Sequence, residues 1–348
     1  MKRIVVAALL FASAFVSVAK AQDTIRVGWT IPAEESKYWM MRRPEKFPNL
    51  GKGYKIEWSQ FQGTSPMTQA LIAGALDCAT QGVLPIAQSM DKGTLATYVI
   101  AQHVGEKPGS FSVYWAVKDD SPIKKVEDLK GKTVGISIIG GGTQGPFNLM
   151  LKRHGVDPDK DIKLVEVSFS LSEDALRQGR VDSVNMNQPF AARAEAKGGI
   201  RKLFALEEAV PNIVHIVEAC RKDFVDKNPE LVKQYVKDIT AGLKMALANR
   251  EETMKVVSEI TKAPVPVLDT YLLKGNDFAR EPGAAPNFAG IQAMFDVYTN
   301  EKMIEKKLDA KTLRHPGDFA WTDQGGSTLV LKNNSGKEVR LVSFLLKP

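Results

Sequence analysis

The order of apolar runs and amphipathic stretches along the chain predicts alternating strands and helices. Apolar runs such as Thr133–Ile139 alternate with segments such as Phe147–His154, where apolar positions recur every three or four residues. Glycine follows several helical segments, where it can adopt the left-handed conformation that ends a helix. The alternation predicts an α/β fold in which helices flank parallel sheets.

The same set of elements occurs twice, at an interval of about 105 residues, as from Gly74 to Gly179. The first copy has its landmarks, in chain order, at Lys55, Ala70-Leu71, Gly74-x-x-Asp77 and Pro85. The second copy has the matching landmarks at Lys163, Ala175-Leu176, Gly179-x-x-Asp182 and Pro189. Upstream, the strand Ile25–Thr30 corresponds to Lys132–Ser137. We therefore predict two similar doubly wound α/β lobes, which would bind ligand at the carboxyl ends of their strands.

The remainder of the chain predicts mostly helices, at Pro229–Asn249, Arg250–Ile260, Val265–Leu273 and Phe288–Lys306. We expect the chain to cross into the second lobe near Ser112–Val117 and to return near Val214–Ala219, so that two segments form a hinge. The predicted domains are residues 22–113 with 217–320 as lobe one, 114–216 as lobe two and 321–348 as an extension. In that extension, Ser327–Lys332 and Lys337–Leu346 alternate in polarity around a Gly-containing turn, which predicts a hairpin.

The N-terminus has the pattern of a secretory leader. Met1-Lys2-Arg3 is basic, Ile4–Val18 is apolar and Ala19-Lys20-Ala21 is a small-x-small cleavage site. The apolar run is short for a membrane span, which needs about 20 residues. We predict cleavage after Ala21 and a mature protein in the periplasm.

Composition and charge exclude several classes of protein. The 348 residues are 44% hydrophobic and 25% charged, as in soluble globular proteins. Without the three basic residues of the leader, the net charge of +7 falls to +4, which is too small to indicate nucleic-acid binding. Two cysteines exclude a disulfide scaffold, and four scattered histidines show no metal-ligand spacing, so each is expected to be structural or exposed. The sequence contains no GxSxG motif, so nothing in it supports the nucleophile elbow of a hydrolase.

One glycine motif has two interpretations. Gly140-x-Gly142-x-x-Gly145 follows a strand and opens a helix, which formally matches a dinucleotide site, with Glu166 as the acidic residue. The leader and the absence of the motif from the first copy disfavour a nucleotide. The same glycines would equally bring backbone N–H groups close to a carboxylate or sulfonate. We expect no cofactor and no metal.

A resemblance to a known family is carried by the two lobes, the leader, the Gly-x-x-Asp turns and the segment from Val117 to Gly135, which contains Asp128-Leu-Lys-Gly-Lys-Thr-Val-Gly135. With these features the chain resembles the periplasmic substrate-binding proteins of ABC importers. Within these the chain is most similar to the nitrate, sulfonate and taurine group, also called SsuA/THI5-like or NMT1-like. The resemblance covers about residues 23 to 315. It implies a type II periplasmic-binding-protein fold, ligand in a cleft that closes by hinge motion, and a permease with its ATPase as partners. It implies binding without catalysis, and we expect a monomer.

Candidate ligand-binding residues lie in the loops that follow the strands of both lobes. They are Trp29, Thr30, Trp39, Gln62, Thr64, Ser65, Gln81, Gly82, Gly141, Gly142, Thr143, Gln144, Asn187 and Gln188. Hydroxyls, amides and helix N-termini can hold an anion without a full counter-charge. Structural alternatives stay open for each type of residue. Ser65 and Thr143 could serve only as helix caps, Ser65 for a helix that starts at Pro66. The amides could satisfy only backbone groups, and the aromatic residues could belong to the core.

We predict capture of a small organic anion, a sulfonate or carboxylate, for an ABC importer. If Lys37–Pro44 faces the cleft, an aromatic carboxylate or sulfonate is favoured over nitrate or taurine, and if it faces out, nothing follows about the ligand. The alternatives are a periplasmic ligand sensor and a pyrimidine-related enzyme on the same fold, although no catalytic constellation is present. The resemblance also places the returning strand beside Cys78–Gln81, so that Cys78 and Cys220 are either a disulfide or two buried thiols.

Overall fold

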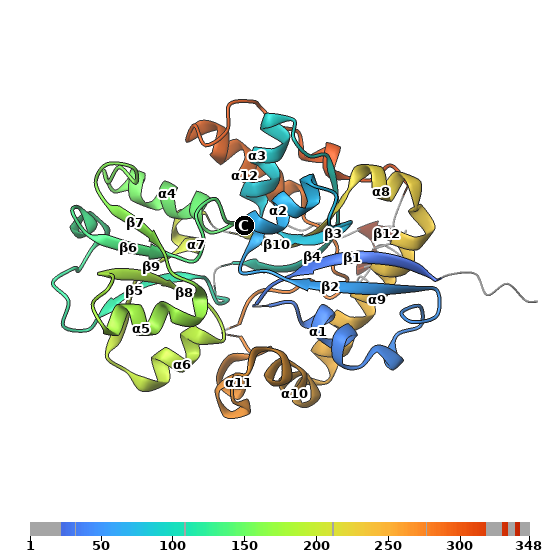
Figure 1. The fold of residues 1–348 in the computed structure, drawn as a ribbon, viewed down its shortest axis with the longest axis horizontal. Coiled ribbons are helices and arrows are strands. Elements are labelled where there is room, and N and C mark those ends of the chain that lie inside the picture. The colour runs from blue at the N-terminus through green and yellow to red at the C-terminus, as the bar shows by residue number, and fades with distance from the viewer. Residues whose placement is uncertain are drawn as a thin grey trace, which may run out of the picture.

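A computed structural model describes residues 22–317, except 32, 108, 211 and 276, together with the backbone of 329–332 and 338–341. The predicted leader, residues 1–21, lies outside these residues, as does most of 321–348. The structure has two α/β lobes side by side, one built from the green elements of Figure 1 and the other from the blue and the yellow to red ones. The expected α/β fold of two lobes is confirmed.

Lobe one is built on a five-stranded sheet with the order β2-β1-β3-β10-β4. Its strands are β1 (Asp23–Trp29), β2 (Tyr54–Gln60), β3 (Cys78–Gln81), β4 (Thr97–Glu106) and β10 (Ile213–Arg221). β1 runs parallel to β2 and β3, whereas β10 runs antiparallel to β3 and β4.

Lobe two has the corresponding order β7-β6-β8-β5-β9. Its strands are β5 (Tyr114–Lys118), β6 (Thr133–Ile136), β7 (Lys163–Glu166), β8 (Ser183–Met186) and β9 (Ile200–Ala205). β5 is antiparallel to β8 and β9. The expectation of purely parallel sheets is therefore wrong for β5 and β10. Each of these strands arrives from the other lobe and enters its sheet at the cleft, where the parallel strands end, so it must run in the opposite direction.

Helices surround both sheets. Lobe one carries α1 (Glu35–Arg42), α2 (Thr64–Ile72), α3 (Val83–Lys92), α8 (Lys222–Lys227), α9 (Pro229–Ala248), α10 (Arg250–Thr261), α11 (Val265–Tyr271) and α12 (Phe288–Asn300). Lobe two carries α4 (Gln144–Arg153), α5 (Ser172–Arg177), α6 (Phe190–Lys197) and α7 (Leu206–Ala209). Short 3-10 helices are η1 (Pro44–Lys46), η2 (Val126–Leu129), η3 (Phe169–Leu171) and η4 (Ala310–Leu313). No helix in the described ranges is long and apolar enough to cross a membrane.

The Gly-x-x-Asp turns have the same role in both lobes. The carboxylate of Asp77 accepts a hydrogen bond from the backbone N–H of Arg26 in β1, at 2.9 Å. The carboxylate of Asp182 accepts one from the backbone N–H of Thr133 in β6, at 2.8 Å. Each aspartate thus ties the chain after a helix to the first strand of its own sheet, as the repeat predicts.

Residues 107–113 join β4 to β5, and residues 206–212 join β9 to β10. The first crossing lies close to the predicted Ser112–Val117. The predicted return at Val214–Ala219 is several residues late, because β10 already begins at Ile213, which pairs with Glu106 of lobe one. Residues 213–216 therefore pair with the lobe-one sheet rather than with lobe two. Outside the two lobes, β11 (Leu329–Lys332) pairs antiparallel with β12 (Glu338–Leu341).

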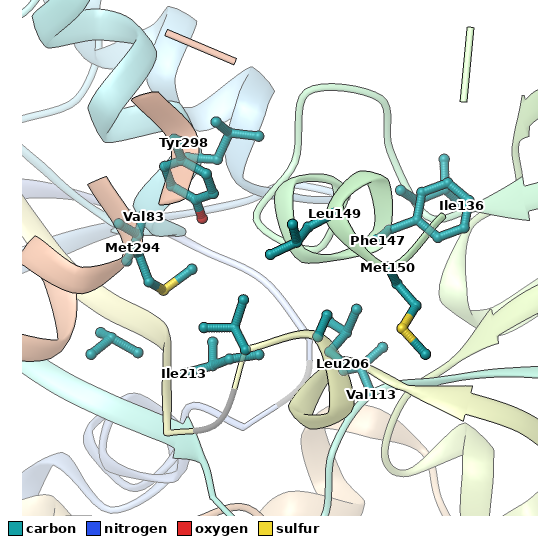
Figure 2. Close-up of a cluster of buried hydrophobic side chains, with 14 of the residues drawn as sticks. Val83, Val113, Ile136, Phe147, Leu149, Met150, Leu206, Ile213, Met294 and Tyr298 are labelled. Atoms are coloured by element: carbon teal, nitrogen blue, oxygen red, sulfur yellow. The ribbon is translucent and has the colours of Figure 1, made fainter. Parts of the chain in front are cut away.

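One apolar cluster spans both lobes. Val83 of α3 with Met294 and Tyr298 of α12 belong to it from lobe one, and Phe147 of α4 with Leu206 of α7 belong to it from lobe two. Figure 2 shows Val83, Met294 and Tyr298 on one side of this cluster, Phe147 beside Ile136 on the other, and Leu206 between them. α6 of lobe two also contacts α11 of lobe one. The lobes are therefore packed against each other in a closed arrangement.

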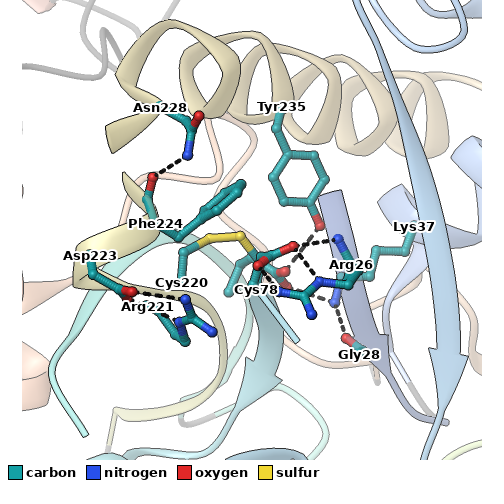
Figure 3. Close-up of a disulfide and its surroundings, with 12 residues drawn as sticks. Arg26, Gly28, Lys37, Cys78, Cys220, Arg221, Asp223, Phe224, Asn228 and Tyr235 are labelled. Atoms are coloured by element: carbon teal, nitrogen blue, oxygen red, sulfur yellow. Dashed lines mark hydrogen bonds and ion pairs between the residues drawn. A yellow bond between two sulfur atoms is a disulfide. The ribbon is translucent and has the colours of Figure 1, made fainter. Parts of the chain in front are cut away.

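A disulfide joins the third strand of lobe one to the returning strand. Cys78 of β3 faces Cys220 of β10 across the antiparallel pair, and the two sulfur atoms are 1.98 Å apart. Figure 3 shows the bond beside Phe224, with Tyr235 of α9 and Lys37 of α1 nearby. The two cysteines are 142 residues apart in the sequence, so the bond covalently ties the end of β10, after the chain returns from lobe two, to the sheet of lobe one.

Candidate functional site

The two lobes approach each other through glycines. A Cβ placed on Gly82, at the start of α3, would lie 2.6 Å from the Cα of Gly142, before α4. A Cβ on Gly63 would lie 3.0 Å from Ile138 Cγ2, and one on Gly145 would lie 2.4 Å from the ring of Tyr298. The missing side chains allow backbone to meet backbone across the cleft. Two of the glycines in the dinucleotide-like motif, Gly142 and Gly145, thus take part in contact between the lobes.

A cavity of about 40 Å³ lies between the lobes behind these contacts. Residues of both lobes line it: Thr30, Ile31, Ala33, Gly63, Thr64, Ser137, Ile138, Gly142, Thr143, Phe169, Asn187, His215, Ile216 and Phe278. One water needs roughly 10–15 Å³ by this measure, so the closed cleft has room for a small head group.

Three helices begin at this cleft. Gly63 is the N-cap of α2, Gly82 that of α3 and Thr143 that of α4, and none of the three supplies a side-chain cap. Each helix has proline as its third residue, which removes one N-terminal N–H donor, and in α4 the N–H of Gln144 already donates to the carbonyl of Gly141, at 3.1 Å. The N-termini of α2 and α4, whose N-cap residues Gly63 and Thr143 line the cavity, favour negative charge there without a charged side chain.

Several buried polar atoms near the cavity have no hydrogen-bond partner. They are Thr64 Oγ1, Ser65 Oγ, Gln81 Nε2, Thr143 Oγ1 and Asn187 Oδ1. A buried polar atom without a partner costs about 1–3 kcal/mol. Atoms from both lobes thus remain available to a polar ligand.

The structure brings five of the predicted binding residues together around the cavity: Thr30, Thr64, Gly142, Thr143 and Asn187. Ser65 is the second residue of α2, which starts at Thr64 rather than at Pro66, so it is not the N-cap that the sequence predicts. Thr143 occupies an N-cap position but makes no capping bond. The capping alternative therefore does not account for these two hydroxyls.

Other predicted residues lie elsewhere. Gln62 is exposed, and Gly141 is buried in the turn before α4. The side-chain oxygens of the remaining amides accept local hydrogen bonds, from Thr68 to Gln81, from the Gly140 N–H to Gln144 and from the Ala192 N–H to Gln188. These amides hold the loops in shape.

The aromatic residues of the first helix face the core of lobe one. Trp39 is 1% exposed and its Nε1–H donates to Thr253 of α10, at 3.1 Å. Trp29 packs edge-on against Tyr38, with ring centroids 6.1 Å apart. A ligand contact by Trp39 is therefore not supported, because α9 and α10 cover this face of α1. The segment gives no reason to expect an aromatic ligand.

A buried ion network lies beneath the cleft loops of lobe one. Lys37 Nζ lies 2.6 Å from Glu218 Oε2 and 3.2 Å from Glu34 Oε2, and it donates to Thr80 Oγ1 at 2.6 Å. The other oxygen of Glu34 accepts the backbone N–H of Thr30, at 3.0 Å, which positions a residue of the cavity. The ammonium group of Lys37 is paired with these carboxylates and this hydroxyl, so it does not serve as the counter-charge of a ligand.

Sequence reasoning missed two important cavity residues, His215 and Phe278. Their rings are stacked, with centroids 5.6 Å apart. His215 was expected to be structural or exposed, although its place on the returning strand near the hinge was a signal that could have identified it. Phe278 comes from the connection after α11, which shows no periodic pattern. Within the described residues, no group of three or more His, Cys, Asp or Glu side chains is placed to hold a metal ion.

Comparison with known proteins agrees with this geometry. A family model described as NMT1/THI5 like matches residues 52–253. The chain is 23% identical over 318 residues to a protein of Escherichia coli (strain K12) named as binding aliphatic sulfonates, covering 89% of this chain and 94% of that protein. It is 25% identical over 281 residues to the taurine-binding periplasmic protein of the same organism, covering 78% and 82%.

Among solved structures, the alkanesulfonate-binding protein SsuA from Xanthomonas axonopodis pv. citri, bound to MOPS, superposes with a TM-score of 0.68. The match covers 84% of this chain and 98% of that protein at 18% sequence identity. At that identity the likeness shows the fold, and it confirms the expected type II periplasmic-binding-protein architecture.

Proposed function

The chain belongs to the NMT1/THI5-like family, and on that premise we propose that it is an extracytoplasmic solute-binding protein that captures a small organic anion between its lobes. The observation that carries the proposal is the convergence of the N-termini of α2 and α4, with the unpartnered hydroxyls of Thr64 and Thr143, on a cavity between the lobes. Such a site offers hydrogen-bond donors from both sides.

The donors favour an anion over a cation or a neutral ligand. No Lys, Arg, Asp or Glu is among the residues that line the cavity. Helix N-termini carry about half a positive charge each, so a cation would be repelled, whereas an anion gains from those of α2 and α4. The hydroxyl groups of Thr64 and Thr143 can donate hydrogen bonds to the oxygen atoms of a ligand, whether that ligand is charged or neutral.

Among organic anions we place sulfonates first. The relatives that cover most of this chain are named as binding aliphatic sulfonates and taurine, and the SsuA structure contains MOPS, which is itself a sulfonate. A sulfonate presents three oxygen atoms, which can accept hydrogen bonds from the donors of both lobes at once. The cavity of about 40 Å³ suits a head group with a short aliphatic tail better than an aromatic acid.

The predicted leader, with cleavage after Ala21, and the periplasmic relatives support function in the periplasm. We propose that the closed protein delivers its ligand to the permease of an ABC importer and that it acts as a monomer. The alternative role as a ligand sensor uses the same site and differs only in the receiving membrane protein. Growth on the ligand as the limiting nutrient, which needs the gene for uptake and not for signalling, separates the two.

Titration calorimetry with a matched set of ligands tests the proposal. Ethanesulfonate, taurine, nitrate and propionate supply different anions, ethyl methyl sulfone is the neutral analogue of a sulfonate, and ethyltrimethylammonium is a cation. We expect saturable binding of one equivalent for at least one sulfonate and none for the sulfone or the cation. Binding of the cation in preference to every anion would refute the site.

A further inference from the structure

The only titratable side chain among the residues that line the cavity is His215. It is 6% exposed, and its Nδ1 lies 3.2 Å from Oε1 of Glu106, which is fully buried. Glu106 is the last residue of β4 and His215 follows the second crossing, so the pair bridges the two hinge segments. Its position connects the ligand cavity to the hinge.

A β-bulge directs His215 into the cavity. Val214 pairs with Gly105 and Ile216 pairs with Val104, so His215 is an extra residue in β10 with no partner in β4. In a regular strand, neighbouring side chains point to opposite faces. The bulge lets both His215 and Ile216 line the same cavity.

The surroundings of the pair favour one proton between the two groups. The hydroxyl of Ser112, in the first crossing, donates to Glu106 Oε2, while Glu106 Oε1 has no hydrogen-bond partner besides its contact with the imidazole. Burial raises the pKa of Glu106 to about 8, outweighing the hydrogen bonds with Ser112 and the backbone of Val113, which act to lower it. Burial lowers the pKa of His215 to about 4. At neutral pH the carboxyl group is therefore protonated and the imidazole is neutral.

In the described part of the chain, none of the other charged or titratable groups around the pair supplies a positive charge that would hold Glu106 in its carboxylate form. Glu207 of α7 adds a negative charge that raises the pKa of Glu106 further. Asp277, next to Phe278, is paired with Arg280, which also binds Glu35. β3 faces β10 with Thr80 and Gln81, which do not titrate, and the phenol of Tyr298 in α12 stays neutral because burial raises its pKa.

We propose that His215 contacts the bound anion and that a proton stored on Glu106 moves to it when the anion enters, which makes anion capture dependent on pH. The step breaks the O–H bond of Glu106 and forms an N–H bond at Nδ1 of His215. It leaves a carboxylate beside an imidazolium, whose other N–H faces the anion. No proton is exchanged with solvent and the net charge of the pair stays zero, but its positive half then lies on the side of the bound anion. The inference rests on the proposed function, because it requires an anionic ligand.

The proton has a consequence for the pH profile. Above about pH 8 the free protein loses the proton from Glu106, and the anion must then bring a proton from solvent. The affinity should stay constant from pH 6 to 7 and fall about tenfold for each pH unit above 8. At pH 9 one proton should be taken up for each anion bound.

Calorimetry with ethanesulfonate and nitrate, which stay ionised throughout, measures this between pH 6 and 9.5 in buffers of different ionisation enthalpy. Glu106→Gln should abolish the fall above pH 8, and His215→Gln should weaken binding at pH 7 at least tenfold with an unchanged melting temperature. The matched control is Glu127→Gln, which removes the carboxylate of another His–Glu pair, at 3.1 Å from His154 and half exposed. That variant should keep the wild-type profile.

Two outcomes would overturn the proposal, and they are distinguishable. If none of ethanesulfonate, taurine, nitrate and propionate binds at pH 6.5, where Glu106 holds its proton, the proposed function fails and this inference fails with it. If a probe binds but its affinity is flat to pH 9.5, or if Glu106→Gln keeps the wild-type slope, only the role of the Glu106–His215 pair is refuted.

Discussion

Gly82 of lobe one and Gly142 of lobe two meet backbone to backbone, so closely that a Cβ on Gly82 would lie 2.6 Å from the Cα of Gly142. The contact exists only when the lobes are closed. A side chain at this point would therefore act on the closed form and leave each lobe by itself unaffected.

The first prediction concerns closure. Gly82→Ala should weaken binding of ethanesulfonate by about 1–3 kcal/mol, the usual cost of overpacking, which is about 5-fold to 150-fold in affinity. The backbone at Gly82 has φ −86, so alanine fits the local conformation and the melting temperature of the free protein should not change. Calorimetry and thermal unfolding of the same variant measure both quantities.

Gly275→Ala is the control for this variant, because nothing lies within 4 Å of its Cβ position. It should bind as the wild type does. Equal affinities for Gly82→Ala and Gly275→Ala would show that the Gly82–Gly142 contact is not part of the ligand-bound state.

The second prediction concerns the cavity hydroxyls. Thr143 is 4% exposed, lines the cavity and has an unpartnered Oγ1. Thr143→Val keeps the shape of the side chain and removes the donor, so binding should weaken by about 1–3 kcal/mol. Lys124→Ala removes a charge at an exposed position far from the cavity lining and should change the affinity much less. A larger effect of Lys124→Ala in calorimetry would contradict the assignment of the site.

The third prediction concerns the disulfide. The chain has two cysteines, and Cys78 is bonded to Cys220. Protein unfolded without reductant should therefore show no titratable thiol, and the double replacement Cys78→Ala with Cys220→Ala should lower the free energy of unfolding by about 2–5 kcal/mol. Two free thiols in the unfolded, unreduced protein would exclude the bond.

The fourth prediction concerns the buried network of lobe one. Lys37→Met removes the cation between Glu34 and Glu218 and should destabilise the fold by about 3–5 kcal/mol, because both carboxylates then lie buried without it. Lys52→Met, at an exposed position, is the control and should change the free energy of unfolding little. Urea unfolding of the two variants measures the difference.

The network also has a pH signature. Burial acts to raise the pKa of Glu218, but the charge of Lys37 and the hydrogen bond with His103 outweigh it and hold the pKa below its ordinary value of 4.5. Glu218 thus contributes stability above pH 4.5 that is lost as the pH falls through its lower folded value. In Lys37→Met the effect of burial gains weight, and this acid-side loss should shrink or disappear. An acid limb of the same size in both proteins would assign it to other groups.

The repeated half of the fold could be predicted from the sequence because it depends on local signals. Gly74 with Asp77, and Gly179 with Asp182, end a helix and tie the chain to the first strand within one unit. The direction of β10 could not be predicted in this way, because it depends on the route that the chain takes from the other lobe. The positions of the four late helices followed from their periodicity, although α12 ends at Asn300 rather than near Lys306.

The candidate site was predicted where loops follow strands, as for Thr64, Thr143 and Asn187. It was missed where the geometry is not local. A bulge directs His215 into the cavity, and no residue pattern marks a bulge. The prediction that Trp39 lies at the cleft was wrong. Its environment is set by Thr253, 214 residues further along the chain, and the local sequence does not show this partner. Which face of an aromatic helix is covered is decided by the partner that packs on it.

The central claim is that an organic anion is held between two lobes that close over it, and small-angle scattering of the wild-type protein with ethanesulfonate tests it most directly. The two crossings at 107–113 and 206–212 are the segments about which we expect the lobes to open and close as rigid bodies. The account predicts a smaller radius of gyration at saturating ethanesulfonate and no change with ethyl methyl sulfone. Identical scattering curves with and without ethanesulfonate, at a concentration where calorimetry shows a filled site, would contradict it.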